Sequence, residues 1–262
     1  MKGMPDIDAT DQQGQIPTNL RLLVLLEEVA KVGVPVTPSS LKDTLNLPKP
    51  TLHRLFKTAE AAGYLQRDID GKSFGPGPRL RRLAVNTVSS QRMRTVRLAI
   101  LRNVAREIGE TCNIATPDRE GMTYLDRVET LWPLRIQLPV GTQVPFHCTA
   151  SGKMYLSTLQ PAYLDRYLAT ASLDSHAPGT ITDKKALKEE IELTRNRGYS
   201  IDNQEFMEDM VAIAVPILDD QKRLTSTLSV HAQVQRHSLE ALKSHLERLK
   251  AGAHELSELI NS

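Results

Sequence analysis

The hydrophobic positions of the chain follow two different periods. In the first ninety residues apolar side chains recur every three or four positions, which predicts amphipathic helices. Between about residues 111 and 138, and again between 199 and 231, apolar and polar residues alternate, which is typical of strands. Two later stretches, 183–197 and 238–260, return to helical spacing. The pattern predicts a mainly helical N-terminal part followed by an α+β domain with an antiparallel sheet.

Three helices are expected in the first part. The first begins near Thr18 and ends before Gly33. Its apolar positions are Leu22, Leu23, Leu26, Val29 and Ala30. The second covers residues 37–45, because Thr37 suits an N-cap and the proline after it fits the first helical position. Asn46 tolerates the left-handed backbone that ends a helix, so a tight turn should lead into the third.

The third helix runs from about Lys49 to Ala62, and a hairpin follows it. Its apolar stripe consists of Leu52, Leu55, Phe56 and Ala59. The opposite side carries the candidate nucleic-acid contacts Lys49, Thr51, His53, Arg54 and Lys57. Gly63 ends the helix, and Asp70–Gly71 suits a two-residue hairpin turn. Arg67 and Lys72 beside that turn are candidate contacts to a phosphate backbone.

Helix, turn, helix and hairpin in this order are typical of a winged helix-turn-helix, which reads DNA. The alternative is a helical hairpin with an ordinary solvated basic face. Charge favours DNA. Residues 18–92 contain 12 Lys and Arg against 6 Asp and Glu, whereas residues 1–17 and 93–262 each carry a net charge of −2. The net charge of +2 for the whole chain therefore conceals a basic N-terminal domain, as phosphate binding requires.

Residues 74–78 (FGPGP) are expected to interrupt regular structure, and residues 79–91 to form a helix. Its apolar side contains Leu80, Leu83, Ala84 and Val88. Two interpretations stay open. The helix is a simple connector, or it is a linker helix that pairs with its twin in a second copy and sets the spacing of the two half-sites on DNA.

The second domain is expected to begin near Met93 with a long helix, residues 94–110, followed by hairpin-linked strands. The helix places Val96, Ile100, Val104 and Ile108 four residues apart, with Ala99 and Leu101 beside them. The predicted strands are 111–116, 122–128, 134–138, 199–201, 211–217 and 224–231. A helix over 183–197 should end at Gly198, and one continuous helix should span 238–260. The predicted divisions are a disordered tail (1–17), a DNA-binding domain (18–78), a linker helix (79–92) and an effector domain (93–262).

Composition excludes several classes of protein. No apolar run approaches the ~18 residues that a membrane span needs, and the polar first 17 residues lack the apolar segment of a signal peptide. The two cysteines, Cys112 and Cys148, form no CxxC pair. A cytoplasmic protein with reduced thiols and no cofactor is therefore expected.

Three stretches resemble the IclR family of transcriptional regulators, and the resemblance extends from about Thr18 to Ile260. Residues 45–55 (LNLPKPTLHRL) are similar to the family's recognition-helix run. Residues 140–153 (VGTQVPFHCTASGK) match its G-x-x-x-P-x-H-x-x-A-x-G-K signature, the most specific of the three. Residues 197–205 (RGYSIDNQE) are similar to its glycine-aromatic-x-x-Asp-x-x-Glu segment.

The resemblance implies a winged helix-turn-helix joined by a linker helix to a GAF-like effector domain. It also implies a homodimer or homotetramer that changes its affinity for operator DNA when a small organic or aromatic carboxylate binds. Carried over by position, the effector site comprises Val144, Ala150, Ser151, Gly152, Asp202, Ala212, Ser229 and His231. Two positions depart from the family pattern: members that bind small keto acids often have a hydroxyl residue where this chain has His231, and a thiol can stand at Ala212.

The chemistry of the signature run suits an anion. Residues 149–152 precede or open a helix, and small residues there let a ligand approach free amides at a helix N-terminus. Ser151, Ser229 and His231 offer further donors. Lys153 is interpreted as solvated or paired with a local carboxylate, and His147 as a residue that stabilises a turn. Asp202 suits an anion site only if it accepts a ligand hydroxyl or orders the loop.

The cysteines and histidines of the chain raise two other functions, thiol catalysis and metal binding. Cys148 with His147, His231 and Asp202 contains the residue types of thiol catalysis, but a lone buried cysteine is usually inert, so no catalytic residue is assigned. No pair of residues has metal-ligand spacing, so no metal site is assigned either. The prediction is a ligand-controlled transcriptional regulator, more specifically a repressor. The alternatives are a redox- or metal-responsive regulator, and a DNA-binding dimer whose second domain serves only for assembly.

Overall fold

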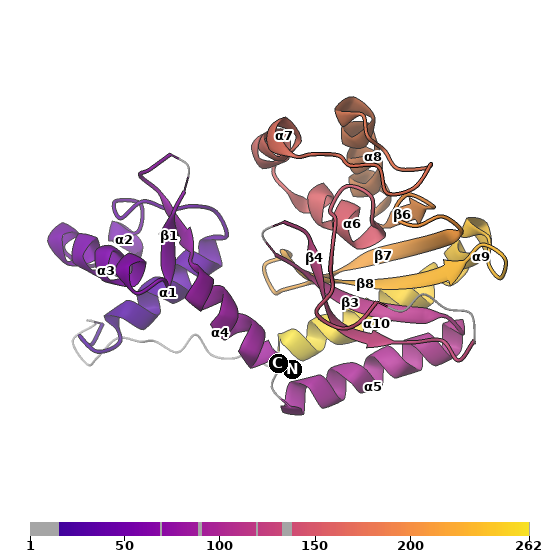
Figure 1. Ribbon diagram of the computed structural model, residues 1–262. Helices are drawn as coiled ribbons and strands as arrows, with labels where there is room; N and C mark the ends of the chain where they lie inside the picture. Colours follow the sequence, from indigo (N-terminus) through magenta and orange to yellow (C-terminus); the bar gives the residue numbers. More distant parts are fainter. Residues whose placement is uncertain (1–15, 69, 89–90, 119, 133–137, 262) are drawn as a thin grey trace. The chain divides into compact units, whose positions relative to one another are not determined.

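The computed structural model describes residues 16–68, 70–88, 91–118, 120–132 and 138–261. The chain divides into two compact units, with the boundary between Ser90 and Gln91. Each unit has its own hydrophobic core, and Figure 1 shows the elements of both.

The described residues of the first unit form four helices and a hairpin around one apolar core. Helices α1 (Arg21–Val32), α2 (Lys42–Leu45) and α3 (Lys49–Ala61) are followed by strands β1 (Leu65–Arg67) and β2 (Phe74–Pro76) and by helix α4 (Pro78–Val88). The core is formed mainly by Leu25, Leu26, Val29, Leu52, Phe56, Leu65 and Phe74. The inner face of α1 thus includes Leu25, whereas the predicted Leu23 is 55% exposed.

The second predicted helix is shorter than expected. Thr37 and Ser40 exchange hydrogen bonds between side chain and backbone, which holds residues 38–41 in a turn, and α2 begins only at Lys42. The threonine that was expected to cap a helix caps a turn instead. Asn46 does have the predicted left-handed conformation (φ 46°), and α3 starts three residues later.

The hairpin after α3 differs from the predicted two-residue turn. Asp68 N donates to Ser73 O, so four residues form the loop. The Asp70 carboxylate accepts hydrogen bonds from the Ser73 hydroxyl and from the amides of Ser73 and Lys72, and these bonds hold its pKa at about 2. The expected break at 74–78 was also wrong, because Phe74–Pro76 pairs with β1 and Phe74 bridges to Val36.

The second unit is built on a six-stranded antiparallel sheet. Its strand order is β5-β4-β3-β8-β7-β6. The strands are β3 (Thr111–Pro117), β4 (Met122–Val128), β5 (Gln143–Val144), β6 (Ser200–Asn203), β7 (Met210–Leu218) and β8 (Leu224–Gln233). The antiparallel sheet that the alternating pattern predicted is confirmed, although residues 134–137 of the expected strand 134–138 lie outside the described residues.

Helices cover both faces of this sheet. Figure 1 shows α5 (Gln91–Ile108) and α10 (Leu246–Ile260) along one face, and α6 (Ala150–Thr158) against the other, with α7 (Pro161–Thr170) and α8 (Lys184–Arg197) beyond it. Side chains alternate between the faces along β3. Cys112 and Ile114 lie in the core beneath α5 and α10, and Ala115 lies in the core on the α6 side.

Three predicted features of this unit need correction. Helix α7 was not expected at all. The C-terminal helix is interrupted, since α9 (Leu239–Lys243) ends before α10 begins. Along α5, Val96 is 43% exposed and Arg97 is buried in an ion pair with Asp126. None of the described helices is long and apolar enough to cross a membrane.

Candidate functional site

The strand register of the sheet assembles a polar patch on its α6 face. Two rows of directly opposed residues cross β6, β7, β8 and β3. The first row is Asp202, Ala212, His231 and Thr111, and the second is Ser200, Ala214, Ser229 and Asn113. Four of the predicted effector residues, Asp202, Ala212, Ser229 and His231, therefore share one surface although they are up to 29 positions apart in sequence.

Three buried polar atoms around this patch lack partners. They are Ser151 Oγ, Asp202 Oδ2 and Asn113 Nδ2, and within the part of the chain that the structure describes none of them has a hydrogen bond. Their side chains are at most 2% exposed. An unsatisfied buried polar group costs about 1–3 kcal/mol. A ligand that supplies the missing partners would recover this free energy, so the three atoms mark a candidate binding site.

The sequence interpretation missed Asn113. Arg127 Nη1 donates to Asn113 Oδ1 at 3.0 Å, which orients the amide and leaves the Nδ2 group as the unpartnered donor. The signal was present: a carboxamide in the predicted strand 111–116, between apolar Cys112 and Ile114. Its position opposite Ser229, 116 residues later, is visible only in the folded sheet.

Ser229 and His231 form a hydrogen-bonded pair. Ser229 Oγ lies 3.0 Å from His231 Nε2, and the imidazole stands edge-on to Tyr124. Burial, and to a lesser degree the charge of Arg127, lowers the pKa of His231 to about 3. The ring is therefore neutral near pH 7, and it offers a ligand hydrogen bonding rather than positive charge.

One carboxylate oxygen of Asp202 accepts hydrogen bonds, and the other has no partner among the described residues. Its Oδ1 accepts from the amides of Glu205 (2.8 Å) and Phe206 (3.4 Å), while Oδ2 has no partner. Burial, together with the charge of Glu205, raises the pKa of Asp202 to about 7. Near neutral pH this carboxyl can both accept and donate a hydrogen bond.

The N-terminus of α6 contributes the residues of the signature run. Thr149 is the N-cap, and its Oγ1 accepts from Gly152 N at 3.0 Å. The assignment of Gly152 as a ligand contact is thus corrected, because its amide is already satisfied. A Cβ at this position would overlap the backbone of Phe146, so glycine is required for close packing. The amides of Ala150 and Ser151 have no partner in the described residues.

The remaining predicted effector residues are apolar and fully buried. Ala150 and Ala212 pack together with Met154 and Ala214, so small side chains allow α6 to lie close to β7. Val144 lies instead in a separate cluster with Met122 and Tyr124. The side chains of these three residues are apolar and offer no polar contacts.

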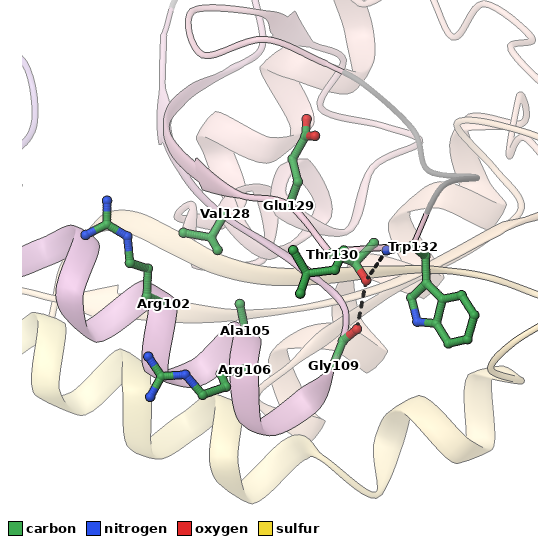
Figure 2. Close-up of a pocket in the computed structure, with 9 residues that line it drawn as sticks. Arg102, Ala105, Arg106, Gly109, Val128, Glu129, Thr130 and Trp132 are labelled. Carbon is green, nitrogen blue, oxygen red and sulfur yellow. Dashed lines mark hydrogen bonds between the residues drawn. The ribbon is translucent and has the colours of Figure 1, made fainter.

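A hollow lies between α5 and the end of β4. This pocket of about 600 Å³ is lined by Arg102, Ala105, Arg106, Gly109, Val128, Glu129, Thr130, Leu131 and Trp132 (Figure 2). The Thr130 hydroxyl donates to Gly109 O at 2.9 Å. None of the unpartnered buried atoms found in the described residues belongs to its lining, so it is the weaker candidate for a polar ligand.

In the first unit, α3 presents a cationic surface. Lys49, His53, Arg54 and Lys57 are exposed and Thr51 is half-buried, on the side away from the buried Leu52, Phe56 and Ala59. On the hairpin, Lys72 is exposed. Arg67 makes contacts within the unit: its guanidinium donates two hydrogen bonds to Glu60 and lies over the Phe74 ring. We therefore assign Arg67 to bracing the hairpin against α3.

The comparison with known proteins decides the family. Residues 85–258 match the family model described as the bacterial transcriptional regulator IclR C-terminal domain. The chain belongs to the IclR family.

The whole chain resembles curated and solved IclR-family regulators. It is 35% identical to a probable transcriptional regulator, SauR, of Cupriavidus necator, over 90% of this chain and 94% of that protein. It is 26% identical to the transcriptional repressor IclR of Escherichia coli, over 88% and 85% of the two chains. The crystal structure of an IclR homologue from Microbacterium hydrocarbonoxydans, complexed with 4-hydroxybenzoate, aligns with a TM-score of 0.59 at 26% identity, over 92% of this chain and 98% of that one.

These relatives are transcriptional regulators and not enzymes, in agreement with the sequence interpretation. IclR-family regulators bind DNA, and one solved homologue holds a small aromatic acid. The family assignment made from the three sequence stretches is confirmed.

Proposed function

We propose that this IclR-family protein is an operator-binding repressor whose DNA affinity is controlled by a small organic or aromatic carboxylate. The observation that carries the effector part is the set of three buried, unpartnered polar atoms around the α6 face of the sheet. The first unit is the DNA reader, of winged helix-turn-helix type, and the second is a GAF-like effector domain.

In the proposed reader, α3 enters the major groove of operator DNA. Its exposed residues include Arg54, which suits a bidentate contact to guanine, and Lys49 and Lys57, which suit phosphates. Lys72, on the hairpin loop, meets the adjacent backbone. Within the described residues these cations form no ion pairs. Their charge is therefore available to DNA phosphates and bases, which supports this proposal.

The proposed effector combines an acid with a hydroxyl. Ser151 Oγ, Asn113 Nδ2 and the free amides of Ala150 and Ser151 are donors beside the positive end of a helix, so they suit a carboxylate. Asp202 Oδ2 suits a ligand hydroxyl. The relative that binds 4-hydroxybenzoate holds a ligand with this same pair of groups.

We propose that the effector controls DNA binding through a population shift. Effector binding would stabilise one arrangement of the effector domains and thereby change the fraction of protein able to bind DNA. Two copies are needed to read two half-sites, and α4, on which Leu83 is 54% exposed, is the proposed pairing helix.

The positions of the two cysteines on the sheet argue against the alternative of a redox-responsive regulator. Cys112 lies beneath α5 and α10, and Cys148 lies beside α6 on the opposite face, so the two thiols cannot form a disulfide within the folded domain. Burial also raises the pKa of each thiol to about 12, which makes both poor nucleophiles.

A thermal-shift screen with keto, hydroxy and aromatic acids tests the proposal. A ligand that binds only the folded state raises the melting temperature by mass action. We expect at least one hydroxy or aromatic acid to do so and to change operator affinity in a gel-shift titration. Absence of any stabilising acid would leave assembly as the role of the second domain.

A further inference from the structure

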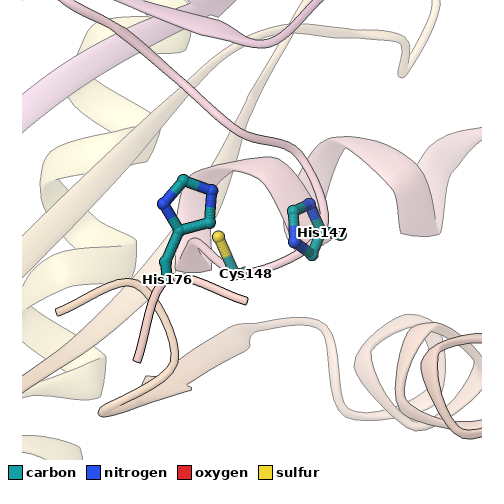
Figure 3. Close-up of side chains that lie close together, drawn as sticks. All are labelled: His147, Cys148 and His176. Atoms are coloured by element: carbon teal, nitrogen blue, oxygen red, sulfur yellow. The ribbon is translucent and has the colours of Figure 1, made fainter. Parts of the chain in front are cut away.

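Three metal-binding side chains meet beside the N-terminus of α6. His147 and Cys148 immediately precede the Thr149 N-cap, and His176 lies on the segment between α7 and α8. One ligand atom from each residue lies within 4.8 Å of those of the other two. Figure 3 shows the Cys148 sulfur between the two imidazole rings. Sequence spacing gave no sign of this, because His176 is 28 positions from Cys148 and the whole of α7 separates them.

The three donors suit a soft divalent cation. Zinc binds imidazole nitrogen at ~2.0–2.1 Å and thiolate sulfur at ~2.3 Å, so tetrahedral geometry places ligand atoms roughly 3.3–3.8 Å apart. The present separations, at most 4.8 Å, need to shorten by up to about 1.5 Å. His147 and Cys148 are buried, whereas the His176 side chain is exposed, with its ring beside that of His147.

The surroundings already hold the two segments together. His147 Nε2 lies 2.9 Å from the Asp174 carbonyl oxygen, so the segment that carries His176 is fastened to His147 by a hydrogen bond. Burial lowers the pKa of His147, so its imidazole is neutral and keeps a lone pair. The neighbouring cation Lys153 is neutralised by Glu205. Lys153 therefore presents no uncompensated positive charge to a metal ion at this place.

We propose that His147, Cys148 and His176 form a zinc site that joins the α7–α8 segment to the N-terminus of α6. On binding, a Zn–S bond replaces the S–H bond of Cys148, and the proton leaves to solvent. Three protein ligands leave a fourth position on the exposed His176 side for water or a ligand atom. Its three ligands are different residues from Ser151, Asp202 and Asn113, which carry the unpartnered atoms, so zinc binding can be tested without an organic acid.

Zinc titration of the full-length protein tests the site. After chelator treatment and dialysis, we expect one Zn²⁺ per chain in competition with a chromophoric chelator, and a rise in melting temperature. Co²⁺ used in its place should give the charge-transfer absorption of a cobalt–thiolate bond. His176→Ala should weaken Zn²⁺ binding at least about 10-fold, because loss even of a partner outside the ligand shell costs that much. Cys148→Ser should abolish the cobalt–thiolate band.

Two matched variants serve as controls. His254→Ala removes an exposed histidine on α10, and Cys112→Ala removes the other buried thiol. Both should bind Zn²⁺ as the parent does. Equal Zn²⁺ affinity in His176→Ala and the parent, or absence of the cobalt–thiolate band in the parent, would overturn the proposal. His176 is exposed, so its variant folds even if Cys148→Ser does not.

Discussion

Lys153 and Glu205 form a fully buried ion pair between α6 and the turn that follows β6. The Lys153 Nζ lies 2.5 Å and 2.6 Å from the two carboxylate oxygens of Glu205, and 3.8 Å from Glu190. The lysine is 0% exposed. The interpretation of Lys153 as solvated was wrong, and the alternative, a local carboxylate partner, is confirmed. The pair locks the α6 end of the effector site to Asp202, three residues before Glu205.

Lys153→Met should destabilise the second unit by about 3–5 kcal/mol, because it leaves the buried Glu205 charge without its partner. Urea denaturation measures this. Lys250→Met, at an exposed pair on α10 with Glu247, is the matched control and should change stability by less than about 1 kcal/mol. A small effect at Lys153 would mean that water reaches Glu205.

Asp202→Asn should stabilise the protein at pH 8. Burial raises the pKa of Asp202 from 3.8 to about 7, and the titratable groups near it are Glu205, Lys153, Cys148 and Tyr124. Between those two values the folded state holds the extra proton, so stability falls as pH rises through about 4 to 7 and is level above. Asparagine keeps the Oδ1 acceptor and removes the cost, on the order of 2–4 kcal/mol.

The measurement for Asp202 is the free energy of unfolding against pH, in chelator, for parent and variant. The difference between them should grow from pH 4 to pH 7 and then stay constant. A difference independent of pH would show that Asp202 is not protonated in the folded state over this range.

Arg54→Ala should weaken operator binding about 10-fold or more, since one good contact to a base is worth ~1–3 kcal/mol. The side chain is exposed, so the melting temperature should not change. Lys31→Ala removes an exposed cation from α1, outside the proposed contact surface, and serves as control. Gel-shift titration at fixed salt compares the two, and equal losses would mean that α3 acts only through overall charge.

Local signals predicted much of the fold. The left-handed residues Asn46, Gly63 and Gly198 and the side-chain cap Thr149 act within a few positions, and the helices bounded by them are confirmed. The hydrogen bonds between Thr37 and Ser40 also act over a short range, but they stabilise a turn in place of the first part of the predicted helix 37–45. The sequence interpretation took Thr37 as a helix cap and therefore made this helix too long. Helix α7 was missed although Pro161 at its start and buried Leu164 and Leu168, four apart, signalled it.

The site was predictable only in part, because its geometry comes from the register of strands far apart in sequence. The resemblance to the IclR family predicted Ser151, Asp202 and Ser229 as effector residues. It did not give Asn113, which faces Ser229 across β3 and β8, or His176, which reaches Cys148 across α7. Both depend on long-range pairing that no window of sequence contains.

The sharpest test of the effector site compares two serines on one helix. Ser151 and Ser157 are each 2% exposed, but Ser157 Oγ donates to Met154 O at 2.7 Å and Ser151 Oγ has no partner among the described residues. Ser157→Ala should therefore cost about 1 kcal/mol of stability and leave effector affinity unchanged. Ser151→Ala should leave the stability of the ligand-free protein equal or higher, because it removes an unsatisfied hydroxyl.

With an acid identified in the screen, isothermal titration of the two variants separates the roles. Ser151→Ala should weaken effector binding roughly 3- to 10-fold, the worth of one hydrogen bond of about 0.5–1.5 kcal/mol. Operator affinity without effector should be unchanged in both. If Ser151→Ala instead lost stability and kept effector affinity, the Ser151 hydroxyl would stabilise the fold and would not bind the effector. The acid would then have to bind elsewhere, and the pocket between α5 and β4 would be the next candidate.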